Sequence, residues 1–94
     1  MSELDKLAEY LKKHHYRYVR IDEPPVKVNE YLTMDRHQVI VYNREGSWQW
    51  DAICHRGSYG HEEGLLEVMG SVTNDDVEGW LTADEIIKRL EGAK

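Results

Sequence analysis

The sequence predicts one α+β domain (residues 1-94), in which an antiparallel sheet of three or four strands packs against an N-terminal helix, a C-terminal helix and a short third helix. Apolar residues with helical spacing occur near both ends of the chain, and β-type runs separated by turn residues lie between them. Hydrophobic residues make up 40% of the 94 residues and charged residues 32%, which indicates a folded domain rather than a disordered segment.

The first helix is predicted to begin after Ser2, which is suited to cap its N-terminus, and to end near His14-His15. Residues three and four apart fall on one face of a helix, so a regular apolar spacing marks the face that is buried. That spacing is followed by Leu4, Leu7, Ala8 and Leu11.

The first strand is predicted over Tyr16–Ile21, where β-forming residues alternate between two faces. Pro24-Pro25 is expected to end this strand, because two residues without N–H groups cannot serve a central ladder. Val26–Leu32 is a candidate for a short edge strand.

A β-hairpin is predicted in the middle of the chain. Gln38–Tyr42 contains the unbroken apolar run Val39-Ile40-Val41, which is typical of a strand covered on both faces. Asn43–Gly46 has turn chemistry, and Ser47–Cys54 is the returning strand.

Residues 62–72 permit two interpretations. Leu65, Met69 and Val72 have helical spacing and favour the short third helix, whereas Leu66 and Val68 favour a strand. The flanking glycines weaken the helical interpretation, but the helix is the preferred prediction.

The last helix carries the strongest local signals. Thr82 and Glu85 match a capping box, and Leu81 and Ile86 are placed to form a hydrophobic staple across the helix start. With the stripes and strands above, this helix completes a predicted core of Leu4, Leu7, Leu11, Val19, Ile21, Val39, Val41, Trp50, Ile53, Leu65, Met69, Ile86, Ile87 and Leu90.

The sequence contains no apolar run long enough for a membrane span and no signal-peptide pattern, so no membrane partner is expected. A single cysteine excludes an internal disulfide, and a cytoplasmic location is therefore predicted. The net charge of −6 is carried entirely by residues 48–94, which hold ten acids and four bases. Between Arg56 and Lys88 there are eight acids and no Lys or Arg.

Two segments of the second half carry a resemblance, one beginning Gly57-Ser58-Tyr59-Gly60 and reaching Gly70, the other beginning Val77-Glu78-Gly79-Trp80 and reaching Glu85. They resemble small uncharacterised accessory proteins of Gram-positive bacteria and their mobile elements. The resemblance covers roughly the second half of the chain. It implies no activity and no site residues.

Catalysis, metal binding and a cofactor are not expected. Cys54 and His55 are adjacent on a predicted strand and point to opposite faces, so they cannot form a nucleophile–base pair; a Cys54–His61 pair remains an alternative. The histidines and glutamates of residues 54–63 match no standard metal-ligand spacing. A small Cys/His enzyme or metal site in this segment is kept as an alternative, because the residue types for it are present.

The sequence instead predicts a non-enzymatic protein-interaction module, an inhibitor or adaptor, whose acidic second half meets a basic protein surface. Exposed aromatic residues among the acids would supply the desolvated anchor that charge alone lacks. The predicted partner-binding residues are Tyr59, Glu62, Glu63, Asp75, Asp76, Glu78 and Trp80.

Two other partners are weighed against that prediction. The basic-aromatic stretch 12–20 is a candidate for nucleic-acid binding, although the acidic second half disfavours nucleic acid as a partner. A homodimer is the second alternative, because a second copy would cover an open sheet edge. The nucleic-acid-binding residues would be Lys12, Lys13, Arg17, Tyr18 and Arg20.

Overall fold

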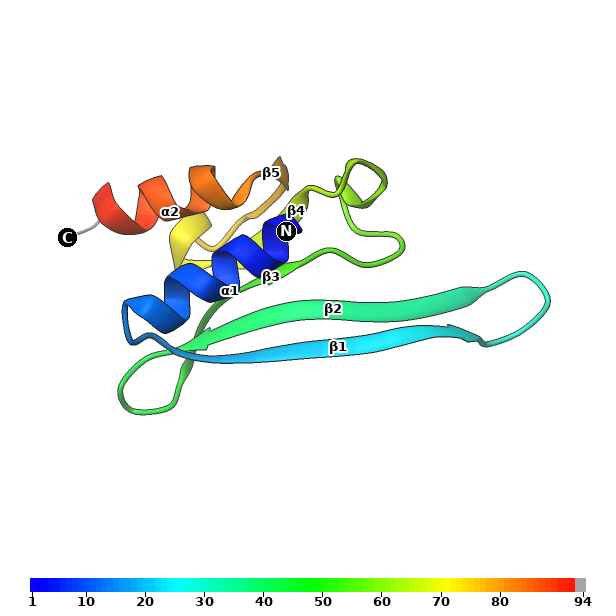
Figure 1. Ribbon diagram of the computed structural model, residues 1–94, viewed down its shortest axis with the longest axis horizontal. Helices are drawn as coiled ribbons and strands as arrows, with labels where there is room; N and C mark the ends of the chain where they lie inside the picture. The colour runs from blue at the N-terminus through cyan, green and yellow to red at the C-terminus, as the bar shows by residue number, and fades with distance from the viewer. Residues whose placement is uncertain (93–94) are drawn as a thin grey trace.

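Two helices lie against one face of a five-stranded antiparallel sheet in the computed structural model, which describes residues 1–92 (Figure 1). The strands follow one another in sequence order across the sheet, so every connection is local. The elements are α1 (Glu3–Lys13), β1 (Arg17–Lys27), β2 (Thr33–Tyr42), β3 (Trp48–Ile53), β4 (Leu66–Gly70), β5 (Val77–Leu81) and α2 (Ala83–Gly92), with 3₁₀ turns η1 (His61–Glu63) and η2 (Ser71–Thr73).

The predicted α+β class and both terminal helices are confirmed, but the sheet has five strands rather than three or four. The two additional pairings come from β4 and β5, which extend the central hairpin on one side. The predicted short third helix over residues 62–72 is wrong, because those residues hold η1, β4 and the start of η2.

Residues 66–70 form the strand β4 rather than a helix, because pairing with β3 and β5 buries alternate side chains. Leu66 and Val68 are fully buried, whereas Met69 faces solvent. Gly70 has φ of +128°, and a Cβ there would lie 2.4 Å from the backbone oxygen of Gln49. Only glycine permits this close approach of β4 to β3, and a helix through the position would lose it.

Both helix starts are capped as the sequence predicts. The hydroxyl of Ser2 accepts a hydrogen bond from Asp5 N (3.0 Å), and Thr82 Oγ1 accepts one from Glu85 N (3.2 Å). In each case the acidic side chain accepts a bond from the cap residue's own N–H, which completes a capping box. A carboxylate oxygen of Glu3 in α1 also accepts from Ala83 N at the start of α2 (2.8 Å), so the two helices are tied together.

The first strand runs through Pro24-Pro25 to Lys27, and the prediction that the prolines end it is wrong. β1 is an edge strand, and the pairing with β2 shifts register between Glu23 and Val26. A missing N–H is tolerated at a bulge on an edge. Of the candidate strand Val26–Leu32, only the first two residues pair with β2; the rest form the turn of the β1–β2 hairpin.

The β1–β2 hairpin extends well beyond the helices, and the molecule measures 47 × 26 × 25 Å (Figure 1). Its far end, residues 24–34, is here called the hairpin tip. Tyr31 at the turn is 94% exposed. Other large apolar side chains that are exposed in the tip are Val26, Val28, Leu32 and Met34.

The core lies between the helices and the face of the sheet that they cover. Seven predicted core residues are buried there: Leu4, Leu7, Leu11, Val39, Val41, Trp50 and Ile86. The core also includes Ala8, Ala52, Leu66, Val68, Leu81 and Ala83. The predictions for Val19 and Met69 are wrong, since both are exposed on the uncovered face. Partial burial is found for Ile21, Ile53, Leu65, Ile87 and Leu90.

Candidate functional site

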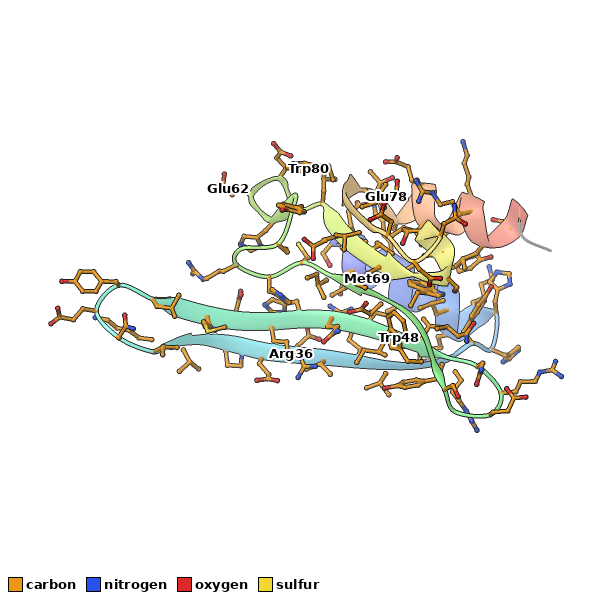
Figure 2. All side chains as sticks on the ribbon, turned by 180° about the vertical axis from the view of Figure 1, so that it is seen from behind. Arg36, Trp48, Glu62, Met69, Glu78 and Trp80 are labelled. Carbon is orange, nitrogen blue, oxygen red and sulfur yellow. The ribbon has the colours of Figure 1, made fainter. Side chains whose placement is uncertain are left out.

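The predicted partner-binding residues lie in three places rather than one. Tyr59, Trp80 and the glutamates of η1 gather where the loop after β3 meets the end of β5 (Figure 2). Asp75 and Asp76 occupy the turn before β5, roughly 13 Å away along the strand at about 3.4 Å per residue. Glu78 lies between the two groups.

The first group is built around an exposed aromatic pair. The rings of Tyr59 and Trp80 are stacked, with centroids 5.4 Å apart and an interplanar angle of 12°. Each side chain is nevertheless 55% exposed. Large aromatic side chains usually bury most of their surface, so a stacked pair on the outside is a feature of interaction surfaces.

Two glycines and an unusual backbone conformation set this pair in position. A Cβ on Gly79 would lie 2.3 Å from the Cβ of Tyr59, and Gly60 packs against the backbone of Trp80. Trp80 itself has φ of +56°, which is rare for a bulky residue and costs on the order of 1 kcal/mol. The backbone N–H of Trp80 donates to the carbonyl of Tyr59 (3.3 Å), closing the contact between loop and strand.

The glutamates near the Tyr59–Trp80 pair differ in whether they form an ion pair within the chain. Glu62 and Glu63 are exposed, and within residues 1–92 neither forms an ion pair. Glu78 is bound by Arg89 of α2 through both guanidinium NH₂ groups, one of them at 3.0 Å, and this pair lowers the pKa of the Glu78 carboxyl. Glu78 is therefore a structural partner of α2 rather than a free acid.

The turn acids Asp75 and Asp76 are exposed and shaped by the turn itself. Asp75 has φ of +62°, and a carboxylate oxygen of Asp76 accepts from the N–H of Val77 (2.9 Å). The structure does not bring these two acids together with the aromatic pair.

The basic-aromatic stretch is divided between different environments. Arg20 is held by the carboxylates of Asp5 (2.6 Å) and Asp22 (2.8 Å), which neutralise it. Tyr18 is partly buried against the core. Lys12 and Lys13 lie at the end of α1, and Arg17 lines an open pocket of about 610 Å³ with His14, His15, Tyr16, Tyr42, Asn43 and Arg44.

Cys54 and His61 line different pockets. Burial raises the pKa of the Cys54 thiol, and the nearby Asp35 carboxylate adds to this effect. A raised thiol pKa disfavours the thiolate that a nucleophile needs. In the part of the chain that the structure describes, no three His, Cys, Asp or Glu side chains are arranged to hold a metal ion.

Three features of the structure were missed by the sequence analysis. One is the role of Gly79, which the spacing alone does not reveal. Another is the exposed apolar hairpin tip. The third is the uncovered sheet face around Asp51, whose side chain accepts a hydrogen bond from Gln38 Nε2 (2.6 Å). A signal for this face is present in the sequence, because β1 and β2 carry apolar residues on both of their faces and the helices cover only one.

Within residues 1–92, the helices are too short and too polar to cross a membrane. Comparisons of the chain with protein-family models, with curated proteins and with solved structures gave no match.

Proposed function

We propose that this chain is a non-enzymatic interaction module, an inhibitor or adaptor, that binds a basic protein surface through the Tyr59–Trp80 pair and the adjacent glutamates of η1. The observation that carries the proposal is the stacked pair, half exposed, beside two carboxylates that have no cation of their own in residues 1–92. An aromatic face next to carboxylates is the chemical complement of an arginine or lysine side chain.

In this proposal, the aromatic rings and the carboxylates bind the same cation through different interactions. A guanidinium stacked on the exposed face of Trp80 gains about 0.5–2 kcal/mol from the cation–π interaction. On this proposal, Glu62 and Glu63 of η1 pair with the edge of the same cation. The remaining acids of residues 48–94 act over a longer distance, by speeding encounter with a positive patch and by repelling acidic molecules.

A titration with a synthetic arginine-rich peptide tests this proposal. We expect a saturable shift of the Trp80 indole N–H signal in NMR spectra, and no shift with a glutamate-rich peptide of equal length. Trp80→Ala should weaken binding at least about tenfold, as for a central anchor of an interface. Gly79→Ala should have a similar effect, because its Cβ would displace Tyr59 while leaving both aromatic residues in the chain.

Two variants of equal charge separate site-specific binding from general attraction. Glu62→Lys/Glu63→Lys should lose about tenfold or more in affinity, because the paired carboxylates are removed. Asp75→Lys/Asp76→Lys makes the same change in net charge at the other end of β5 and should lose clearly less. Equal losses in the two variants would contradict the proposal and leave only non-specific attraction.

Nucleic-acid binding is the second candidate function, and the pocket around Arg17 and Arg44 favours it. Both arginines line this pocket together with His14 and His15, and Arg17 Nη1 donates to the carbonyl of Arg44 (3.1 Å). A single-stranded oligonucleotide titration in the same spectra distinguishes the two functions. Tight binding with amide shifts confined to residues 12–20 and 42–45, and none at Trp80, would replace the proposal with this alternative.

A further inference from the structure

The uncovered face of the sheet carries one apolar row that crosses all five strands. Val19, Ile40, Asp51, Met69 and Val77 are direct partners in successive strand pairs. Four of these five side chains are apolar, and the single carboxylate stands on the central strand β3. The adjacent row, Ile21, Gln38, Ile53 and Glu67, has two apolar and two polar side chains, with its carboxylate on β4.

This row faces solvent although its residues are those of a core. The exposed fractions of Val19, Met69 and Val77 are 46%, 45% and 44%. Both helices pack on the opposite face, and Met69 and Trp48 project from the side away from them (Figure 2). Contiguous exposed apolar residues of this kind mark interaction surfaces in soluble proteins.

Asp51 is the polar centre of this surface, and neither its carboxylate nor that of Glu67 forms a direct ion pair within residues 1–92. Gln38 Nε2 donates to the Asp51 carboxylate, and Arg36 reaches it only through Gln38, whose Oε1 accepts from Arg36 Nη2 (2.8 Å). Partial burial raises the pKa of the Asp51 carboxyl and the Glu67 carboxylate adds to the rise, whereas the nearby His55 lowers this pKa. A half-buried carboxylate without a direct cationic partner is costly, and a cation carried by a molecule that covers the face would lower that cost.

A second copy of this chain would not lower that cost. A two-fold axis through the centre of the face would bring two Asp51 carboxylates together, and like charges across an interface cost free energy. A partner that is apolar and carries a basic side chain at its centre satisfies both the row and the carboxylate.

We propose that the uncovered sheet face is a docking surface for an apolar segment of another protein that carries one lysine or arginine, which pairs with Asp51. This surface adjoins the Tyr59–Trp80 pair, because Glu67 of the adjacent row accepts a hydrogen bond from the N–H of Tyr59 (3.1 Å). The inference rests on other side chains, those of the row through Asp51, so it goes beyond the proposed function and does not depend on it.

The width of the apolar row sets the length of a helical peptide that can test this proposal. Five strands at about 4.8 Å spacing give a row of roughly 19 Å, which an α-helix of about 13 residues matches at 1.5 Å per residue. Three synthetic amphipathic peptides of about that length, with one apolar face, differ only at the central residue of that face, which is Arg, Gln or Glu. Binding is followed by the methyl signals of Ile40, Met69 and Val19.

The Arg peptide should shift these methyl signals and bind about tenfold more tightly than the Gln peptide, with the Glu peptide weakest. Asp51→Asn, which keeps an acceptor for Gln38, should abolish the preference for Arg over Gln. Trp80→Ala should leave the Asp51-dependent preference for the Arg peptide over the Gln peptide unchanged, so that failure of this inference and failure of the proposed function are told apart.

Three outcomes would overturn the inference. One is equal binding of the Arg and Glu peptides, and another is binding without methyl shifts at Ile40 and Met69. The third is a wild-type dimer in sedimentation experiments whose interface includes those two methyl groups. A wild-type monomer, with self-association appearing only in Asp51→Asn, would support it.

Discussion

The two faces of the sheet use alternate residues of the same strands, yet only one face is covered by helices. On the covered face, Val39, Val68 and Leu66 are completely buried beneath α1 and α2. On the other face, Val19, Met69 and Val77 occupy equivalent strand positions and remain nearly half exposed. Folding therefore uses one set of apolar residues for stability, and the second set is free to contribute to binding.

The largest test of this comparison replaces one residue on each face of β4. Leu66→Ala should lower the free energy of unfolding by about 2–5 kcal/mol, because it removes buried methyl groups and leaves a cavity. Met69→Ala should change it by less than about 1 kcal/mol, since the side chain is already in contact with water. Chemical denaturation of the two variants measures both values, and similar losses would mean that the uncovered face also carries the fold.

A smaller effect is expected at the cap of α2, which belongs only to the covered face. Thr82→Ala removes the hydrogen bond to Glu85 N and should cost about 1 kcal/mol. Thr82→Ser keeps the hydroxyl and serves as the control. Thermal denaturation checks the cost, and an unchanged melting temperature in the alanine variant would show that the cap does not stabilise the helix.

The smallest expected effect is a gain in stability, and it comes from a substitution at Asp51 on the uncovered face. Because burial raises the pKa of Asp51 in the folded state, the folded chain holds this proton more tightly than the unfolded chain. The resulting stability is present below the unfolded pKa and is lost as pH rises through the folded pKa, so ionised Asp51 opposes folding at neutral pH. Asp51→Asn should therefore raise the stability modestly at pH 7.

The pH dependence of that gain is the sharper measurement. The difference in unfolding free energy between Asp51→Asn and the wild type should shrink towards about pH 3, where the aspartate of the unfolded chain is also protonated. A gain that persists unchanged at acid pH would mean that charge at Asp51 is not its cause.

Local signals explain most of what the sequence predicted correctly. The caps at Ser2 and Thr82 depend on residues three positions apart, and the stripe of α1 depends on spacing within one helix. The continuation of β1 through Pro24-Pro25 was not predictable in the same way. Whether a proline interrupts a strand depends on whether that strand is at an edge, and strand order is a property of the whole sheet.

The same limit applies to the candidate surfaces. The sequence predicts Tyr59 and Trp80 as partner-binding residues, but their stacking depends on how tightly the loop packs over Gly79. The row through Asp51 required the register of four strand pairs, which no single segment contains. Leu65 and Met69 have helical spacing by coincidence, and only the pairing of β4 with β3 distinguishes the strand.

The register shift at Pro24-Pro25 also limits how this protein associates with itself. An open sheet edge is a template on which further strands add, and repeated addition produces fibrils. Near the hairpin tip, Pro24 and Pro25 lack N–H groups and the pairing of β1 shifts register, which interrupts such a template at that end of β1. At the opposite edge, β5 is only five residues long and contains Trp80 at a positive φ, so its hydrogen-bonding groups do not form a straight row. Both edges of this sheet thus contain backbone irregularities that disfavour the addition of further strands.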